Sequence, residues 1–458
     1  MPDEFDVIVL GAGPAGENVA GRCADGGLTT AIVEPRLVGG ECSYWGCIPS
    51  KTLLRPGDVV AAARRVPGAA QVVTGTIDVE AAFEQRDAMT SDWDDTGALP
   101  WLDQHHVALV RGHGRLAGPR VVSVTARDGT TRRLTARLAV AIAVGTTAAM
   151  PPIDGLADAR PWTNEDITST HTVPARLLVL GGGAIGLEMA QAFARFGSAV
   201  TVLEGAGAVL AREEPFAGSE VAAAFAAEGI AVHTSASVAS VRRGDSVVVT
   251  LADGRTFEGD ELLVAVGRSP HTAELGLDSV GLGALAGRYL PVDDRMHVEG
   301  ADGWLYAVGD CNGRALLTHV GKYQARICAD VILGKDASDR RIVPRVTFTD
   351  PQVCAVGLTE AQARDAGIAV RVVSVPTGGV AGAAVSGVGI TGTSLLVVDE
   401  QRRTVVGATF TGPAVQELLH SATVAIAGSV TLDDLWHAVP SFPTVSEVWL
   451  RLLEAYGL

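Results

Sequence analysis

Two stretches of the chain show the same order of apolar runs, glycine-rich turns and amphipathic segments. The first covers residues 5–34 and places short apolar runs at 7–10 and 30–33, with a helical pattern between them. The second covers residues 177–204 and repeats this order. Short apolar runs bounded by turn residues are typical of buried strands, and apolar positions every three or four residues are typical of helices. Each stretch therefore predicts a strand–turn–helix–strand unit of an α/β fold.

The glycines of the first turn have the spacing of a dinucleotide-binding loop. Gly11 permits the tight turn, Gly13 lets the backbone approach a pyrophosphate, and Gly16 allows close packing of helix on strand. The helix N-terminus offers amide groups and the positive end of its dipole to the phosphates. Glu34 follows the second strand and is placed to accept hydrogen bonds from a ribose diol.

The second turn has the same spacing. The equivalent residues are Gly181, Gly183, Gly186 and Glu204. Two dinucleotide sites in one chain imply two cofactors that exchange electrons, most simply a flavin and a nicotinamide. Segments 143–146, 265–268 and 306–310 each read as a strand that ends on small residues, and Asp310 in the last is placed to bind a flavin ribityl hydroxyl.

Composition narrows the class of protein. At 458 residues the chain has room for roughly two to four domains. The net charge of −16 argues against a nucleic-acid partner. No apolar stretch approaches the ~18 residues of a membrane helix, and the opening residues lack the basic region of a signal peptide. We therefore expect a cytoplasmic enzyme without a membrane span. Arg132 and Arg133 are expected in a solvated loop.

The segment GECSYWGCIPSK, residues 40–51, holds two of the six cysteines, Cys42 and Cys47. A structural disulfide is not expected in a reducing compartment, where a cysteine pair is more often catalytic or metal-binding. No second pair at finger spacing and no suitably placed histidine supports a metal site, so we predict none. A redox couple is the leading interpretation, and a buried pair without redox function is the alternative.

Together the motifs resemble those of the pyridine nucleotide-disulfide oxidoreductases, the family of dihydrolipoamide dehydrogenase, glutathione reductase and mercuric reductase. The resemblance runs essentially end to end and is carried by GAGPAG, GGECSYWGCIPSK, GGGAIGLE, VAVGRSP, YAVGDCNGRALLTHV and VPRVTFTDPQVCAVGLTEAQA. It implies two Rossmann-like dinucleotide-binding domains and a C-terminal α+β dimerisation domain. The implied parts are an FAD-binding domain over 1–150, an NAD-binding domain over 151–270, a return to FAD over 271–340 and an interface domain over 341–458, assembled as a homodimer.

The resemblance also assigns roles to the residues of the redox segment. Cys47 resembles the thiol that lies against the flavin, and Cys42 the thiol that attacks the substrate. Lys51 resembles a lysine that pairs with a glutamate beside the flavin, and Glu188 matches that glutamate. Pro49 fits the first turn of a helix, which places Cys47 near a helix N-terminus, where the dipole lowers the pKa of a thiol.

Cofactor contacts are implied on most of these motifs. Those expected for FAD are Gly11, Gly13, Pro14, Ala15, Gly16, Glu34, Gly40, Glu41, Cys42, Lys51, His113, Gly114, Gly145, Asp310, Leu317 and Thr318. Those expected for NAD are Gly181, Gly183, Ala184, Ile185, Gly186, Glu204, Val238 and Gly267. Because Glu204 would repel a 2′-phosphate and residues 205–207 supply no cation, we predict a preference for NADH over NADPH.

Two aromatic residues depart from the family pattern inside the redox segment. Tyr44 and Trp45 stand where the family usually has a small or polar pair, often Asn followed by Val. They are interpreted first as core packing. Alternatively, they narrow the substrate channel or offer a stacking surface to a flat acceptor.

A second departure lies near the C-terminus. Disulfide-reducing members carry a histidine there that acts, from the partner subunit, as acid and base for the thiols. This chain has Phe442 at that position, while Pro443, Thr444 and Glu447 match, and Glu447 is retained as a candidate catalytic residue. A phenyl ring carries no proton. His437 lies five residues upstream and is either a substitute for the missing group or a surface histidine.

Three functions remain open from the sequence. The leading one is an NADH-dependent flavoprotein that reduces a small disulfide through Cys42 and Cys47, with a mixed disulfide at Cys42. The second is an NAD(P)H reductase of quinones, metal ions or other non-disulfide acceptors. The third is a subunit of a larger dehydrogenase complex or a redox-sensing flavoprotein.

Overall fold

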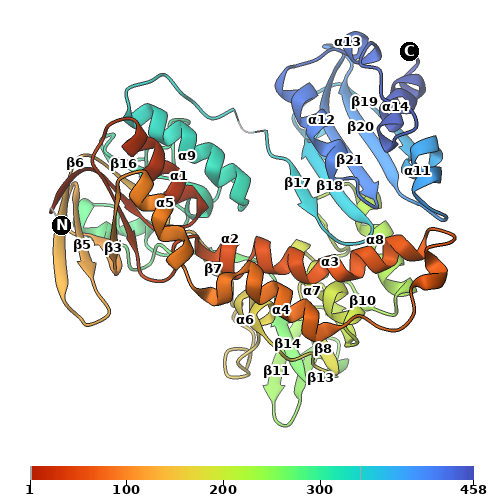
Figure 1. Ribbon diagram of the computed structural model, residues 1–458, viewed down its shortest axis with the longest axis horizontal. Helices are drawn as coiled ribbons and strands as arrows, with labels where there is room; N and C mark the ends of the chain where they lie inside the picture. The colour runs from red at the N-terminus through yellow and green to blue at the C-terminus, as the bar shows by residue number, and fades with distance from the viewer. Residues whose placement is uncertain (1–2, 341) are drawn as a thin grey trace. The chain divides into compact units, whose positions relative to one another are not determined.

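The computed structural model describes residues 3–340 and 342–458 (Figure 1). Contacts divide the chain into two compact units. Unit 1 comprises Met1–Pro49, Arg86–Ala149 and Arg268–Arg341, and unit 2 comprises Ser50–Gln85, Met150–Gly267 and Ile342–Leu458. Helix α3 (Cys47–Arg64) begins in the first unit and continues in the second. None of the helices in the described part of the chain is long and apolar enough to cross a membrane.

Unit 1 is built on a seven-stranded sheet in the order β3-β2-β1-β6-β5-β4, with β16 added beside β6. The strands are β1 (Glu4–Leu10), β2 (Thr30–Glu34), β3 (Val107–Arg111), β4 (His113–Leu116), β5 (Val121–Thr125), β6 (Thr131–Ile142) and β16 (Leu305–Ala307). Strands β3, β2, β1, β6 and β16 run parallel, whereas β5 and β4 are antiparallel. The central strands are buried on both faces, which explains why they read as continuous apolar runs.

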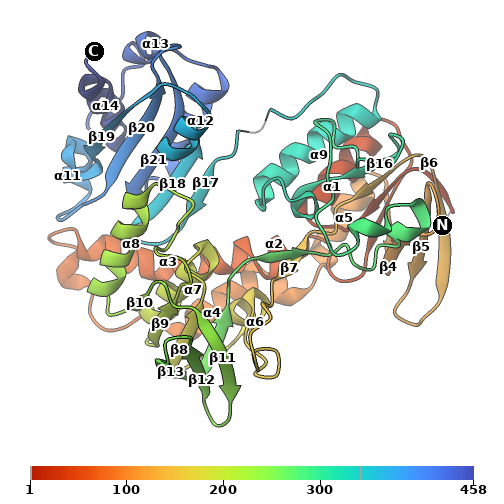
Figure 2. The ribbon, with the colours of Figure 1, turned by 180° about the vertical axis from the view of Figure 1, so that it is seen from behind.

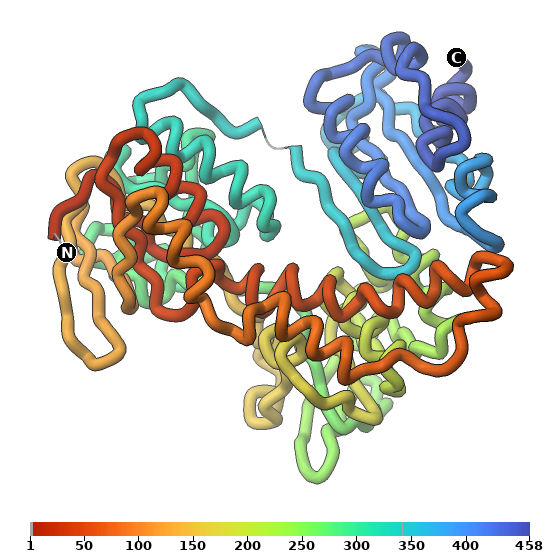
Figure 3. The backbone as a smooth tube through the Cα atoms, in the orientation of Figure 1, coloured from red at the N-terminus to blue at the C-terminus, as the bar shows by residue number. Residues whose placement is uncertain are grey.

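Helices α1 (Pro14–Asp25) and α9 (Thr318–Ile332) pack against each other although they lie far apart in the sequence (Figure 3). Helix α1 follows the first glycine turn directly. A Cβ atom on Gly16 would lie 1.9 Å from the carbonyl oxygen of Gly11, so only glycine permits this helix to start so close to the turn. The first sequence fingerprint therefore corresponds to a real steric requirement.

Unit 2 contains a parallel sheet of four strands in the order β10-β9-β8-β14. They are β8 (Arg176–Leu180), β9 (Ala199–Leu203), β10 (Ala231–His233) and β14 (Glu261–Val264). An antiparallel layer accompanies them, formed by β11 (Val238–Arg243), β12 (Val247–Leu251) and β13 (Thr256–Gly259) (Figure 2). Helices α7 (Ala184–Arg195) and α8 (Pro215–Ala227) belong to this part, and α7 follows the second glycine turn.

The C-terminal part of unit 2 is an antiparallel sheet in the order β17-β18-β21-β20-β19. Its strands are β17 (Arg345–Thr347), β18 (Gln352–Gly357), β19 (Val370–Pro376), β20 (Thr393–Asp399) and β21 (Thr404–Gly412). Helices α12 (Gln416–Ala427) and α14 (Val448–Tyr456) pack on it, and the sheet and helices share one hydrophobic core. Two Rossmann-like sheets and a C-terminal α+β part confirm the predicted fold class.

One local prediction is wrong. Arg132 and Arg133, expected in a loop, lie on β6. The N-terminal half of this long strand has one face in solvent, and its three arginines, Arg132, Arg133 and Arg137, give this half the composition of a loop. Arg132, which is only partly exposed, forms an ion pair with Asp3, 2.5 Å apart.

Candidate active site

The acid of the first glycine turn shapes the turn that it faces. Glu34 Oε2 accepts a hydrogen bond from the Ala12 amide at 2.8 Å, and Oε1 accepts one from the Arg36 amide at 2.7 Å. Burial raises the pKa of this carboxyl, and the two amides oppose the shift. Nearby, the turn meets the start of the redox segment backbone to backbone, because a Cβ on Gly40 would lie only 2.7 Å from the Cα of Gly13. This arrangement fits a bound pyrophosphate and ribose.

The second turn repeats this geometry in unit 2. Glu204 Oε2 accepts from the Gly182 amide at 2.5 Å, and Oε1 accepts from the Ala206 amide at 2.6 Å. The space beside Gly183 is open, because a Cβ atom added there would meet no heavy atom of the described part of the chain within 4 Å. Both turns thus present helix amides, a close-approach glycine and a half-buried or buried carboxylate, the donor set that a dinucleotide requires.

The remaining expected cofactor contacts divide between the two units. In unit 1, His113 and Gly114 lie on β4, Gly145 follows β6, Asp310 follows β16, and Leu317 and Thr318 lie at the start of α9. In unit 2, Lys51 lies on α3, Val238 begins β11, and Gly267 follows β14. Asp310 Oδ2 accepts a hydrogen bond from Thr146 Oγ1 at 3.1 Å, and burial raises the pKa of Asp310.

The two cysteines of the redox segment are neighbours in space. Cys42 lies on the short helix α2 (Gly40–Tyr44), and Cys47 is the first residue of α3. A hydrogen bond between the two thiols, together with burial, raises the pKa of Cys42. Cys47 Sγ also lies 3.3 Å from Thr318 Oγ1 at the N-terminus of α9. Thr318, expected only as a cofactor contact, therefore touches a redox sulfur.

Glu41, directly before Cys42, is held by an arginine that sequence reasoning did not assign. Arg268 contacts both carboxylate oxygens of Glu41, one of them at 3.0 Å from Nη1. Its Nε donates to Thr146 Oγ1 at 2.9 Å. The chain Glu41–Arg268–Thr146–Asp310 thus links the redox segment to the second expected flavin motif within unit 1. In the sequence, the only indication of this chain of contacts was the arginine of the VAVGRSP motif, Arg268.

In unit 2, Lys51 and Glu188 form an ion pair. Lys51 Nζ lies 2.6 Å from Glu188 Oε2, and the carboxylate is almost fully buried whereas the lysine is partly exposed. Glu188 Oε1 accepts a hydrogen bond from the Phe348 amide at 2.9 Å. The ammonium group also lies 4.9 Å from the centroid of the Phe348 ring. The carboxylate joins α3, α7 and the C-terminal sheet.

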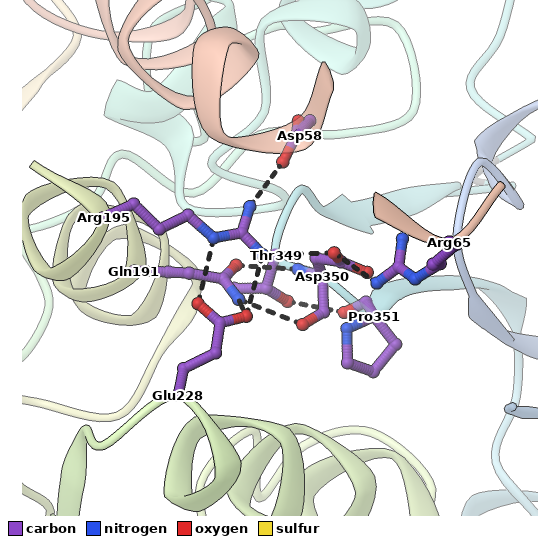
Figure 4. Close-up of polar contacts among 8 residues, drawn as sticks. All are labelled: Asp58, Arg65, Gln191, Arg195, Glu228, Thr349, Asp350 and Pro351. Atoms are coloured by element: carbon purple, nitrogen blue, oxygen red, sulfur yellow. Dashed lines mark hydrogen bonds and ion pairs between the residues drawn. The ribbon is translucent and has the colours of Figure 1, made fainter. Parts of the chain in front are cut away.

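A larger polar network, absent from the sequence-based prediction, fixes the other end of α3 (Figure 4). Arg195 on α7 reaches Asp58 at 3.1 Å, Glu228 at 2.8 Å and Asp350 at 3.1 Å. Arg65 also binds Asp350, at 2.6 Å. A glycine at position 57 permits this crossing, since a Cβ there would lie 2.6 Å from the Arg195 side chain. Burial, with Asp350 nearby, raises the pKa of Asp58 to about 6.

The candidate residues near the C-terminus differ in their exposure to solvent. Glu447 is buried, and its Oε2 atom has no hydrogen-bond partner within the residues that the structure describes. The Phe442 side chain is 75% exposed, so this ring is open to a second molecule. His437 follows helix α13 (Leu432–Trp436) and is exposed. Other large apolar side chains of this part also remain exposed: Val385, Val388, Val424 and Val439. Uncovered apolar groups of this kind mark interaction sites when they are contiguous.

Comparison with known proteins identifies the class of protein. The chain belongs to the pyridine nucleotide-disulphide oxidoreductase family, whose model matches residues 5–325, and the family's dimerisation domain matches residues 343–452. The protein is therefore a flavoprotein oxidoreductase of a family that uses FAD and NAD(P), and the dimerisation domain supports a homodimer.

The particular relatives are reductases and dehydrogenases. Dihydrolipoyl dehydrogenase of Mycobacterium tuberculosis is 34% identical and the alignment covers 97% of this chain and 96% of the relative. Mercuric reductase of Acidithiobacillus ferrooxidans is 32% identical, over 94% of this chain and 79% of the relative. The solved structure of a Cu(II) complex of the flavoprotein disulfide reductase RclA from Escherichia coli is 25% identical, covers 99% of both chains and has a TM-score of 0.87.

Proposed function

We propose that this chain oxidises NADH and passes the electrons through FAD and the Cys42–Cys47 pair to a small acceptor. The observation that carries this proposal is the contact between the two thiols at the start of α3. When bound, FAD accepts hydride from the nicotinamide and supplies two electrons to the cysteine pair. Lys51, Glu188 and Glu447 are proposed as further catalytic residues, and the residues expected above as the cofactor contacts.

With a disulfide acceptor, the chain's own sulfurs complete the reaction. The Cys42 thiolate attacks one acceptor sulfur and displaces the other as a thiolate, which leaves a mixed disulfide on Cys42. Cys47 then attacks Cys42, reforms the internal disulfide and releases the second thiolate. Each leaving thiolate takes up a proton. Thr318, which is hydrogen-bonded to Cys47, is placed to stabilise the Cys47 sulfur until it attacks Cys42.

Phe442 favours a second candidate, a reductase of non-disulfide acceptors such as a quinone or a metal ion. A general acid and base contributes typically ~10²–10⁴ in rate, and a phenyl ring supplies none of it. Electron transfer to a quinone requires no such group at the thiols. The description of a relative, RclA, as a Cu(II) complex is a further reason to include a redox-active metal ion.

A panel of acceptors tests the proposal. NADH oxidation is measured with lipoamide, glutathione disulfide, a soluble quinone and Cu(II), for the parent and for Cys42→Ser. If Cys42→Ser loses turnover with the disulfides and keeps turnover with the quinone, the result supports both the disulfide route through the cysteine pair and the second candidate function. Purified protein should be yellow and release FAD on denaturation, and a colourless protein that FAD does not reconstitute contradicts the proposal.

The organisation proposed for the chain is an FAD-binding domain at 1–150, an NAD-binding domain at 151–270, a segment returning to FAD at 271–340 and an interface domain at 341–458. The homodimer forms through the last of these, where apolar side chains stay exposed in the single chain. Light scattering at micromolar concentration tests the assembly, and a monomer would contradict it.

A further inference from the structure

The two aromatic residues between the redox cysteines are both engaged by the rest of unit 1. The Tyr44 side chain is buried, and its hydroxyl donates to the Val38 carbonyl at 3.1 Å. The Trp93 indole N–H donates to the Tyr44 carbonyl at 3.0 Å. The Trp45 ring is partly buried, and the Arg36 guanidinium carbon lies 4.0 Å from its centroid. The redox segment is therefore attached at three points outside its own helices.

Two of these points lie on residues 34–38, which are themselves held in place. The Val38 amide donates to Asp95 Oδ2 at 2.7 Å. Arg111 binds the same carboxylate and also donates to the Arg36 carbonyl at 2.8 Å. The Arg36 amide is bonded to Glu34, the acid of the first glycine turn. The redox segment is thus anchored to the stretch of chain that carries the proposed ribose ligand.

Among the interpretations that the sequence left open, this geometry favours packing. Tyr44 is core packing with a directed hydrogen bond. The Arg36 guanidinium already occupies one face of the Trp45 ring, so this face is not available for stacking a flat acceptor. Neither residue is a small, flexible link of the kind the family usually places here.

We propose that Tyr44 and Trp45 are positioning residues that hold the two redox sulfurs together and thereby lower the reduction potential of the Cys42–Cys47 pair. This rests on the proposed function. Reduction adds two electrons and two protons and converts the disulfide into two thiols, with NADH as the reductant. A restrained loop keeps the thiols adjacent and favours reclosure, whereas a loosened loop favours the dithiol by restoring chain entropy.

The test is the redox equilibrium of the holoenzyme. The FAD-loaded parent, Trp45→Leu, Tyr44→Phe and Arg36→Gln are equilibrated without oxygen in dithiothreitol buffers of graded potential. Thiols are then trapped by alkylation and counted by mass spectrometry. Each variant should shift the equilibrium toward the dithiol. For Trp45→Leu the ratio of dithiol to disulfide at a given buffer potential should rise about tenfold, which corresponds to a reduction potential higher by about 30 mV. The matched control is Trp101→Leu, which removes a partly buried tryptophan elsewhere in unit 1, whose ring centroid lies 4.5 Å from that of His105.

Further outcomes separate this inference from the proposed function. Arg36→Gln and Trp45→Leu should be non-additive in the double variant, because they remove the same contact. If Trp45→Leu does not fold, Arg36→Gln and Tyr44→Phe give the same measurement. Parent-like potentials with an increased KM for the acceptor would overturn the inference and make Trp45 a substrate contact. A parent whose two cysteines form no disulfide in any buffer would instead refute the proposed function.

Discussion

Glu188 accepts a hydrogen bond from Lys51 Nζ with one carboxylate oxygen and from the Phe348 amide with the other. Three segments far apart in the sequence, on α3, on α7 and at the start of the C-terminal sheet, are therefore joined by one buried carboxylate. This relationship gives Lys51 a structural task besides the catalytic role proposed for it.

Lys51→Met should destabilise the protein more than Glu188→Gln. The methionine variant leaves a buried carboxylate with only one donor, which costs about 1–3 kcal/mol, whereas glutamine removes the charge and keeps an acceptor for the amide. Urea denaturation of the FAD-bound proteins measures the difference. Lys335→Met, which removes an exposed lysine paired with Asp330, is the control and should change stability by less than about 1 kcal/mol. Equal losses in Lys51→Met and Lys335→Met would contradict the structural role.

The thiol assignment predicts a spectroscopic difference between two single variants. While its flavin is oxidised, Cys42→Ser should show a long-wavelength charge-transfer band, because the Cys47 thiolate remains against the flavin as the electron donor, and Cys47→Ser should lack this band. Absorbance on the long-wavelength side of the main flavin bands, recorded for each purified variant, measures the charge-transfer band. Cys354→Ala serves as control, since this thiol is buried in the C-terminal core and burial raises its pKa. The reverse pattern would exchange the roles of the two cysteines.

Nicotinamide preference should depend on the charge of Glu204. Removing the negative charge relieves repulsion of a 2′-phosphate, so the ratio of kcat/KM for NADPH to that for NADH should rise by at least about tenfold in Glu204→Gln. Glu204→Ala should also relax the preference, with a larger loss of overall activity, because the Gly182 and Ala206 amides lose their acceptor. Glu34→Gln changes the same geometry in the other turn and should leave the ratio unaltered. Comparable kcat/KM for both nucleotides in the parent would refute the prediction.

Phe442→His should raise lipoamide reduction and leave quinone reduction nearly unchanged. The introduced ring brings a proton carrier to the proposed acceptor side, and Glu447 Oε2, which accepts no hydrogen bond from the residues that the structure describes, is available to orient it. Steady-state rates with the two acceptors measure the effect.

The competing account assigns the proton to His437. In that case His437→Ala abolishes disulfide reduction, and Phe442→His gains nothing. Fast lipoamide reduction by the parent, with no loss in His437→Ala, would contradict both accounts.

Stability should fall as the pH rises from about 4 to about 6 because of Asp58. Its pKa of about 6 in the folded chain lies above the ordinary value of 3.8, so in this window the folded state binds more protons than the unfolded state. The stabilising contribution of the protonated form is complete below about pH 4 and is lost through pH 6. Asp58→Asn should flatten this part of a Tm–pH profile, whereas Asn at the exposed Asp245 should not. Parallel profiles for Asp58→Asn and the parent would contradict the assignment.

Short-range patterns in the sequence predicted the two glycine turns and their flanking strands and helices, whereas the C-terminal part of the fold was implied by the family resemblance. Glycine spacing and apolar runs encode local geometry, so the turns before α1 and α7 were predictable. Two partners of Arg195, Asp58 and Asp350, were not predictable, because they lie 137 and 155 positions away and a surface charge in the sequence looks the same as a buried one. The Glu41–Arg268 pair, 227 positions apart, was missed for the same reason. The start of strand β6 was misread as a loop because two adjacent arginines, Arg132 and Arg133, resemble a solvated turn in the sequence.

The twofold use of Glu204 has a consequence for protein engineering. Its carboxylate closes the glycine turn through two backbone amides, and the proposed preference for NADH places nucleotide selectivity on the same side chain. A designer who wishes this enzyme to run on the phosphorylated coenzyme has to supply a replacement acceptor together with a cation. A library that varies residues 204–207 jointly is therefore the productive search space, and single substitutions will trade selectivity against turnover.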